Sequence, residues 1–142
     1  MGEALEILLV EDNLGDVEMT KRALRTASTP CRVEVASNGR QALDCLHKAG
    51  RYEGAVTPQL ILLDINMPLM DGKAFLDHVK VSDDFKAIPV VMFTSSESAR
   101  DVRDCYERHA NGYVVKPFDG QAYAAAVRGV IDFWGSLSTL PQ

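Results

Sequence analysis

Polar side chains that could hold a cation and a phosphoryl group follow four short apolar segments of the chain. Glu11 and Asp12 come directly after the first segment, Asp64 after the second, Thr94 after the third and Lys116 after the fourth. Three carboxylates gathered at one place repel one another, and a divalent cation relieves that repulsion. Hard oxygen ligands with no neighbouring His or Cys suit Mg²⁺ better than Zn²⁺. The residue types therefore predict a magnesium site, provided that the fold brings these segments together.

A hydroxyl group at Thr94 and an ammonium group at Lys116 would add what a transferred phosphoryl group needs. These groups supply hydrogen-bond donors and neutralise the negative charge of the phosphoryl oxygens. One carboxylate would then act as the nucleophile and form an acyl phosphate. Asp64 is the best candidate, because its segment is expected to lie between the acidic pair and the Thr94/Lys116 pair.

The elements expected to position these side chains are strands and helices that alternate along the chain. Short apolar or alternating segments predict strands at residues 5–10, 31–36, 60–63, 90–93 and 113–115. Amphipathic segments predict helices at residues 16–27, 42–50, 75–79, 98–109 and 123–134. Five strand–helix units predict an α/β fold, a flavodoxin-like (βα)5 three-layer sandwich whose parallel strands have the order 2-1-3-4-5. In that order the first and third strands are neighbours about 4.8 Å apart, so the three carboxylates converge at their carboxyl ends.

Length, composition and charge limit the classes of protein to which the chain can belong. Its 142 residues, 46% of them hydrophobic, suffice for one domain with its own core, which we expect at residues 1–135 with a tail at 136–142 and no output domain. A net charge of -5 argues against a nucleic-acid-binding surface. No apolar run is long enough to span a membrane, and the acidic start lacks the basic region of a secretory signal. Three cysteines without a CxxC pattern fit a reduced, cytoplasmic protein.

Four ordered segments of the sequence resemble the motifs of the receiver domains of two-component response regulators. They read LLVEDN at 8–13, LLDINMP at 62–68 followed by DG at 71–72, FTS at 93–95 and GYVVKPF at 112–118. The resemblance covers nearly the whole chain. It implies a signalling switch rather than an enzyme, one that catalyses only its own phosphorylation and dephosphorylation.

Carried over residue by residue, the resemblance implies that Asp64 accepts a phosphoryl group from a sensor histidine kinase. Glu11 and Asp12 would hold Mg²⁺ together with Asp64 and the backbone carbonyl of Asn66. Many relatives have two aspartates where this chain has Glu11 and Asp12, so Glu11 is expected to reach the metal through water.

The resemblance also implies how phosphorylation is transmitted. Thr94 and Lys116 would each bind a phosphoryl oxygen, and Thr94 with Tyr113 would form the switch. Tyr113 would move to a buried rotamer behind Thr94, and the face made by the fourth helix, fifth strand and fifth helix would change its binding preference. The Lys116–Pro117 peptide would be cis, as is usual in the family and chemically accessible before proline.

A finer resemblance links the chain to stand-alone regulators that are paired with bacterial phytochromes. It rests on GRYE at 50–53 and on FW at 133–134 followed by TLP at 139–141. It implies a bacteriophytochrome as the kinase and a homodimer formed through the last strand and helix. Trp134, Leu137 and Leu140 are expected to lie uncovered near the tail, which would allow such a dimer. The downstream protein or phosphotransfer partner stays unknown at this point.

Two other functions are compatible with the same fold. A small phosphohydrolase with an aspartyl-phosphate intermediate is the main alternative, although its nucleophile would be expected in a DxD pair where this chain has EDN at 11–13. A flavodoxin-like FMN carrier would need a Ser/Thr/Gly phosphate loop at that place. Simpler roles fit single residues: Tyr113 could merely pack in a core, and we interpret Asp16 as a first-turn residue that interacts favourably with the helix dipole.

Overall fold

The structure is a computed structural model that describes residues 4–141. Its strands are β1 (Leu5–Val10), β2 (Cys31–Ala36), β3 (Leu60–Leu63), β4 (Val90–Thr94) and β5 (Gly112–Val115). Its α-helices are α1 (Leu14–Arg25), α2 (Gly39–Leu46), α3 (Gly72–Val81), α4 (Ala99–Glu107) and α5 (Gly120–Asp132). A short 3₁₀ helix, η1 (Gly50–Tyr52), precedes β3, and a π-helical segment, η2 (Phe133–Leu137), follows α5. Within the described residues, no helix has the length and apolar character that crossing a bilayer requires.

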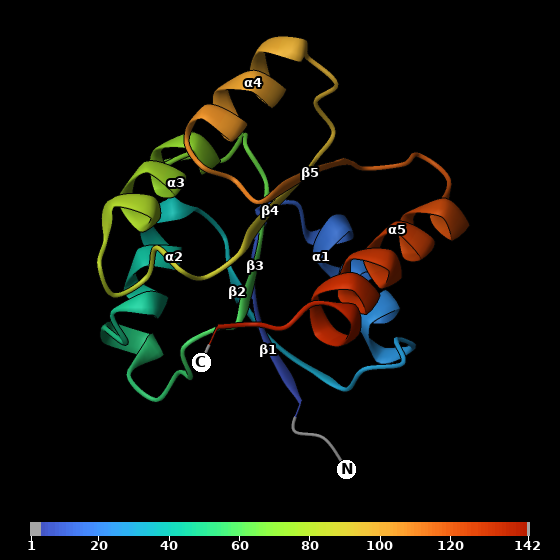
Figure 1. Ribbon diagram of the computed structural model, residues 1–142, viewed down its shortest axis with the longest axis horizontal. Helices are drawn as coiled ribbons and strands as arrows, with labels where there is room; N and C mark the ends of the chain where they lie inside the picture. Colours follow the sequence, from blue (N-terminus) through green and yellow to red (C-terminus); the bar gives the residue numbers. More distant parts are fainter. Residues whose placement is uncertain (1–3, 142) are drawn as a thin grey trace.

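The five strands form one parallel sheet in the order β2-β1-β3-β4-β5, which confirms the predicted flavodoxin-like fold. Helices α1 and α5 cover one face of the sheet, while α2, α3 and α4 lie on the other (Figure 1). Val10 pairs with Leu63 at the ends of β1 and β3, and the Asp64 amide donates to the Val10 carbonyl at 3.0 Å. This register places the residues that follow β1 and β3 side by side.

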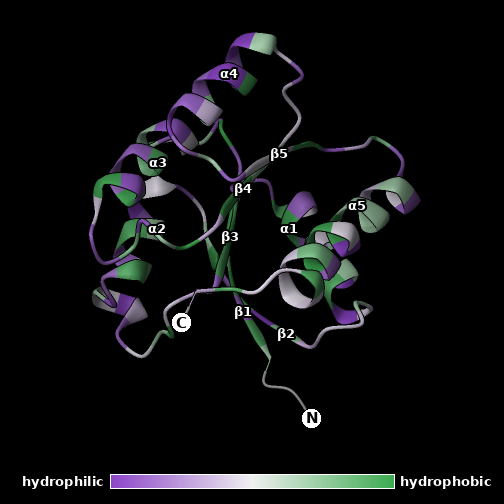
Figure 2. Cartoon of the chain, viewed as in Figure 1, coloured by the Kyte–Doolittle hydropathy of each residue, from purple (hydrophilic) through white to green (hydrophobic). Residues whose placement is uncertain are grey.

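The core has two halves, one on each face of the sheet. Every residue of β3 is buried, because this central strand is covered by helices on both sides. Leu8, Phe75 and Leu76 belong to the half under α2 and α3, whereas Leu9 and Ile131 belong to the half under α1 and α5. The strands are accordingly hydrophobic along most of their length, while the helices carry their hydrophilic residues on the outside (Figure 2). This rigid sheet holds the carboxyl ends of its strands in fixed positions.

Each α-helix begins beside the sheet edge where the strands end, and each is capped by the side chain before it. The capping oxygens accept a backbone N–H three residues further on, which satisfies an otherwise unpaired donor of the first turn. The caps are Asn13, Asn38, Asp71, Ser98 and Asp119. The first helix therefore starts at Leu14, two residues before the predicted start at Asp16, because Asn13 rather than a later residue is the cap.

The segment after α5 turns back across the end of the sheet where the strands begin (red in Figure 1). Trp134 and Leu140 pack against the core half under α1 and α5, so the expectation that they lie uncovered is wrong. The chain reverses closely enough that a Cβ at Gly135 would approach the Leu5 side chain to 3.2 Å. Of the three apolar residues near the tail, Leu137 does project outward, with 80% of its surface exposed.

Candidate functional site

Three carboxylates meet where β1 and β3 end. Glu11, Asp12 and Asp64 each offer an oxygen atom that lies within 4.8 Å of the other two. Glu11 is only 3% exposed, Asp64 is half-buried and Asp12 faces solvent, so the cluster opens at one side. The convergence that strand order predicted is therefore present, and its three oxygen ligands are suited to a hard divalent cation.

A buried ammonium group lies among these carboxylates. Lys116 follows β5 and is only 7% exposed, yet its Nζ reaches Glu11, its closest carboxylate partner. The same Nζ lies 2.9 Å from Asp16 Oδ2 and 3.4 Å from Asp64 Oδ2. The Lys116 backbone N–H donates to the Thr94 carbonyl at 2.7 Å, which fixes the root of the side chain beside β4.

Burial and neighbouring charges shift the pKa values of this pair. Burial raises the pKa of Glu11, the hydrogen bond from Lys116 opposes that effect, and the charge of Asp64 adds to it. Burial alone would lower the pKa of Lys116, but its hydrogen bonds to Glu11 and Asp16 outweigh burial and raise it. Lys116 therefore stays protonated at neutral pH and places a positive charge in the pocket.

The position of Asp64 depends on a tight turn between β3 and α3. The Ile65 amide donates to Asp64 Oδ1 at 2.8 Å, which leaves Oδ2 facing Lys116. The Gly72 amide donates to the Ile65 carbonyl at 2.8 Å, and a Cβ at Gly72 would lie 2.1 Å from the Asp64 carbonyl oxygen. Only a glycine allows α3 to begin this close to the turn.

Thr94 and Tyr113 are joined through the loop after β4. Thr94 is 1% exposed, and its Oγ1 accepts a long hydrogen bond of 3.4 Å from the Ser96 amide. The hydroxyl of the half-buried Tyr113 donates to the Ser96 carbonyl at 2.9 Å. A displacement of this loop would therefore be felt at both residues.

The structure corrects two expectations, one about the Lys116–Pro117 peptide and one about Asp16. No cis peptide occurs among residues 4–141, so Lys116–Pro117 is trans, the isomer that X–Pro bonds favour in the absence of a constraint. Asp16 does more than interact with the helix dipole, because its carboxylate is an ion-pair partner of Lys116. Asn66 lies exposed in the loop two residues after Asp64. One feature of the sequence points to this role of Asp16: it lies in the first turn of the helix that directly follows Glu11 and Asp12.

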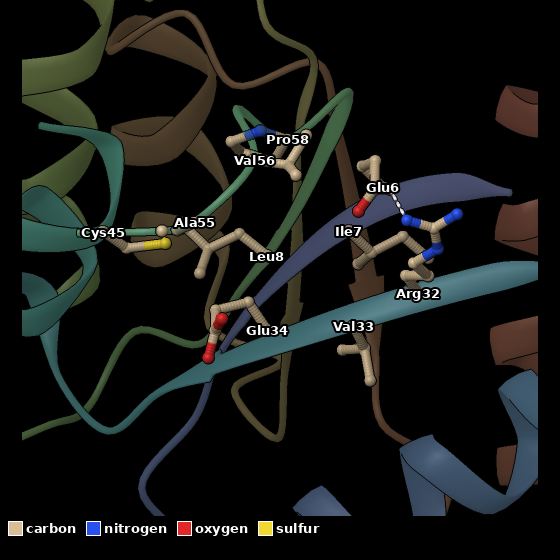
Figure 3. Close-up of a pocket in the computed structure, with 11 residues that line it drawn as sticks. Glu6, Ile7, Leu8, Arg32, Val33, Glu34, Cys45, Ala55, Val56 and Pro58 are labelled. Atoms are coloured by element: carbon tan, nitrogen blue, oxygen red, sulfur yellow. Dashed lines mark ion pairs between the residues drawn. The ribbon is translucent and has the colours of Figure 1, made fainter. Parts of the chain in front are cut away.

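A separate hollow lies on the β1/β2 side of the molecule (Figure 3). It has a volume of about 230 Å³ and is lined by residues that include Leu8, Cys45 and Val56. Glu6 and Arg32 at its rim form an ion pair of 3.3 Å and neutralise each other. None of its lining residues belongs to the acidic cluster, so the hollow is not part of the site at the strand ends.

Comparisons with known proteins agree with this geometry. The family model of the response regulator receiver domain matches residues 7–128. The response regulator Rcp1 of Synechocystis sp. is 37% identical over 135 residues, a region that covers 95% of this chain and 92% of Rcp1. The probable methanogenesis regulatory protein FilR2 of Methanothrix harundinacea is 36% identical over 130 residues, which cover 90% of this chain and 82% of FilR2.

Solved structures of two response regulators have the same fold along nearly their full length. The phosphorylated cyanobacterial phytochrome response regulator RcpA superimposes with a TM-score of 0.94 at 35% identity, covering 99% of this chain and 100% of RcpA. The Mn²⁺-bound form of Rcp1 superimposes with a TM-score of 0.91 at 36% identity, covering 97% and 99% of the two chains. Sequence match, strand order and the acidic pocket at the strand ends lead to one conclusion: this chain belongs to the response regulator receiver domain family.

Proposed function

We propose that the chain is a phosphorylation-activated signalling switch in which Asp64 accepts a phosphoryl group from a sensor histidine kinase. The observation that carries this proposal is the Lys116 ammonium buried among Glu11 and Asp64, with Asp12 at the open side. A buried cation beside a partly accessible carboxylate is the arrangement that stabilises an incoming PO₃ group. The main alternative, a phosphohydrolase, would need the same pocket to turn over phosphate monoesters.

The carboxylate cluster fits Mg²⁺, and we propose that Asp12, Asp64 and Glu11 hold it together with the Asn66 carbonyl. Both Glu11 oxygens already accept hydrogen bonds, one from Lys116 and one from the Asn13 amide at 3.1 Å. Asp12 is exposed, which leaves it the freer ligand. When bound, the cation would neutralise the charge that crowds this pocket and that a phosphoryl group would increase. The Mn²⁺-bound form of the relative Rcp1 supports a divalent cation site in this family.

The bonds that break and form in the transfer belong to the donor and to this chain. A carboxylate oxygen of Asp64 attacks phosphorus, the new O–P bond forms, and the N–P bond of a phosphohistidine breaks with its electron pair returning to the imidazole. Lys116 would offset the negative charge that arrives at Asp64, and the buried Thr94 hydroxyl would donate to a phosphoryl oxygen. Hydrolysis of the acyl phosphate by water would later end the signal.

The signal would leave the site through Thr94, Ser96 and Tyr113. Movement of Thr94 toward the phosphoryl group would pull the Ser96 amide that donates to its Oγ1. The Ser96 carbonyl is the acceptor of the Tyr113 hydroxyl, so the loop and the aromatic ring would respond together. A local change of charge would thus bias the position of the loop that leads into α4.

We infer a bacteriophytochrome as the kinase, because RcpA is a cyanobacterial phytochrome response regulator and the matching AtBRR and RtBRR are bacteriophytochrome response regulators. We also propose a homodimer through β5 and α5. Strand β5 is at the edge of the sheet, and Val115 on it is 37% exposed. Sedimentation of the wild type and of Val115→Asp tests the dimer, which the substitution is expected to dissociate.

The proposed function is tested with acetyl phosphate and Mg²⁺, followed by intact-protein mass measurement. We expect one phosphate on the wild type and none on Asp64→Asn. Asp132→Asn, an identical change at an exposed position of α5, is the matched control and should be phosphorylated normally. Phosphate uptake by Asp64→Asn would remove Asp64 from its role, and rapid turnover of phosphate monoesters by the wild type would favour the phosphohydrolase.

A further inference from the structure

The carboxylate of Asp16 is part of the pocket although it lies on a helix rather than at a strand end. Its Oδ2 lies 2.9 Å from Lys116 Nζ, whereas Asp64 Oδ2 lies 3.4 Å from the same atom. The Lys116 ammonium is therefore nearer to Asp16 than to the proposed phosphoacceptor. The Asp16 side chain retains 26% exposure, so it forms the outer wall of the pocket on the α1 side.

The fold holds Asp16 in this position from two directions. Its amide donates to the capping oxygen of Asn13 at 2.9 Å, which fixes the first turn of α1. Its carbonyl accepts from the Tyr123 hydroxyl at 3.3 Å, which ties the same turn to α5. Two backbone contacts outside the carboxylate cluster thus hold the helical turn that presents the Asp16 carboxylate to Lys116.

The ammonium group has no donor left for a phosphoryl oxygen. Lysine carries three N–H donors. Here they are shared by three carboxylates, those of Glu11, Asp16 and Asp64. A phosphoryl group on Asp64 must therefore displace one of these partners, and Asp16, which belongs to a different element and does not bind the phosphoryl group, is the partner that can be released.

We propose that Asp16 is a positioning residue that holds the Lys116 ammonium on the Glu11 side of the pocket and competes with the phosphoryl group for it. The proposal rests on the proposed function of Asp64 as phosphoacceptor. The charge of Asp16 opposes phosphoryl binding in two ways. It engages the ammonium before the phosphoryl group arrives, and it repels the anionic phosphoryl oxygens. Asp16 therefore weakens phosphoryl binding. Before phosphorylation it also keeps the Lys116 ammonium away from the position that binds a phosphoryl oxygen.

The test measures the affinity of the full chain for beryllofluoride, a phosphoryl mimic, at saturating Mg²⁺ by ¹⁹F NMR. Asp16→Asn keeps the size of the side chain and removes its charge. It should bind beryllofluoride about five- to tenfold more tightly, the effect of losing one competing charge-assisted hydrogen bond. Asp16→Glu keeps the charge and should return the affinity toward that of the wild type. Glu18→Gln, which removes an exposed charge from the same helix, should change the affinity less than about twofold.

Each outcome of this experiment is decisive. Unchanged or weaker binding by Asp16→Asn, with normal binding by the wild type, would overturn the role of Asp16 and leave Asp64 as phosphoacceptor intact. An equal gain in beryllofluoride affinity in Glu18→Gln would show that only the net charge of the protein matters, and this result would also overturn the role of Asp16. A wild type that binds no beryllofluoride would overturn the proposed function and, with it, the role of Asp16.

Discussion

The ammonium of Lys73 on α3 lies 2.7 Å from Asp101 Oδ1 on α4, and it lies 2.9 Å from Asp104 Oδ2 on the same helix. The other oxygen of Asp101 accepts a hydrogen bond of 2.5 Å from the Ser96 hydroxyl, in the loop that follows Thr94. Helix α4 buries only one side chain, Cys105. This helix is therefore attached to the domain mainly by polar contacts, and one of them reaches the loop of the proposed switch.

Replacing Lys73 by methionine should loosen α4 while the rest of the domain stays folded. The change leaves Asp101 and Asp104 without their shared cation, and two partly buried ion pairs of this kind contribute about 1 kcal/mol. Amide hydrogen exchange in α4 should accelerate about fivefold, whereas exchange in β3 should not change.

Lys86→Met is the matched control for this change, because it removes an exposed ion pair with Asp83. It should leave exchange in α4 at the wild-type rate. If Lys73→Met also leaves that rate unaltered, apolar contacts rather than ion pairs hold the helix.

Replacing Gly72 by alanine should destabilise the domain and disturb Asp64. The added Cβ would lie 2.1 Å from the Asp64 carbonyl oxygen, and backbone atoms on both sides must move to relieve the overlap. We expect a loss of about 3 kcal/mol in the free energy of unfolding by urea, with slower phosphorylation. Gly129→Ala on α5 meets no atom within 4 Å and should be neutral or stabilising. Equal stability of the two variants would contradict the close approach.

Removing the exposed carboxylate of the cluster should abolish stabilisation by magnesium. When the concentration of free Mg²⁺ is ten times the dissociation constant of the site, the free energy of unfolding of the wild type should rise by about 1.4 kcal/mol. Asp12→Asn should lose most of this gain. Without metal, the same variant should be at least as stable as the wild type, because one of three mutually repelling carboxylates is gone. Urea titrations with EDTA and with Mg²⁺ measure both effects, and a full magnesium response in Asp12→Asn would exclude Asp12 as a ligand.

Strand positions and the acidic cluster could be predicted from the sequence because both depend on local patterns. The apolar run at 5–10, broken only by Glu6, is the observed β1, and the unbroken run at 60–63 is the observed β3. The parallel strand order then brings Glu11 close to Asp64. The predicted start of the first helix, Asp16, is two residues late, because apolar periodicity does not show that Asn13 caps the helix.

Contacts between segments far apart in the chain could not be predicted from the sequence. Asp16 and Lys116 are 100 residues apart, and no spacing rule relates a first helical turn to the end of the fifth strand. Trp134 and Leu140 were expected to be uncovered, but the chain reverses after α5 and packs them on its own core. In each case the missing information was the path of the backbone between the elements, which apolar periodicity does not encode.

High pH should destabilise the domain through Tyr123. Burial raises the pKa of this phenol to about 12, although its hydrogen bond with Thr20 opposes the shift. The folded state therefore keeps the proton when the unfolded state, with a pKa near its ordinary value of about 10, has begun to lose it. The stabilisation is complete below pH 10 or so and is lost as the pH rises toward 12. Urea midpoints at pH 8, 9.5 and 11 should fall in that order.

Tyr123→Phe separates this ionisation from the hydrogen bonds of the same hydroxyl. At pH 8 the variant should be about 1 kcal/mol less stable, because the 3.0 Å contact with Thr20 and the donation to the Asp16 carbonyl are lost. Its decline between pH 9.5 and 11 should be shallower than that of the wild type, but not absent, since burial also raises the pKa of Cys45 to about 11. An identical decline in the two proteins would show that Tyr123 ionises as freely in the folded state as in the unfolded chain.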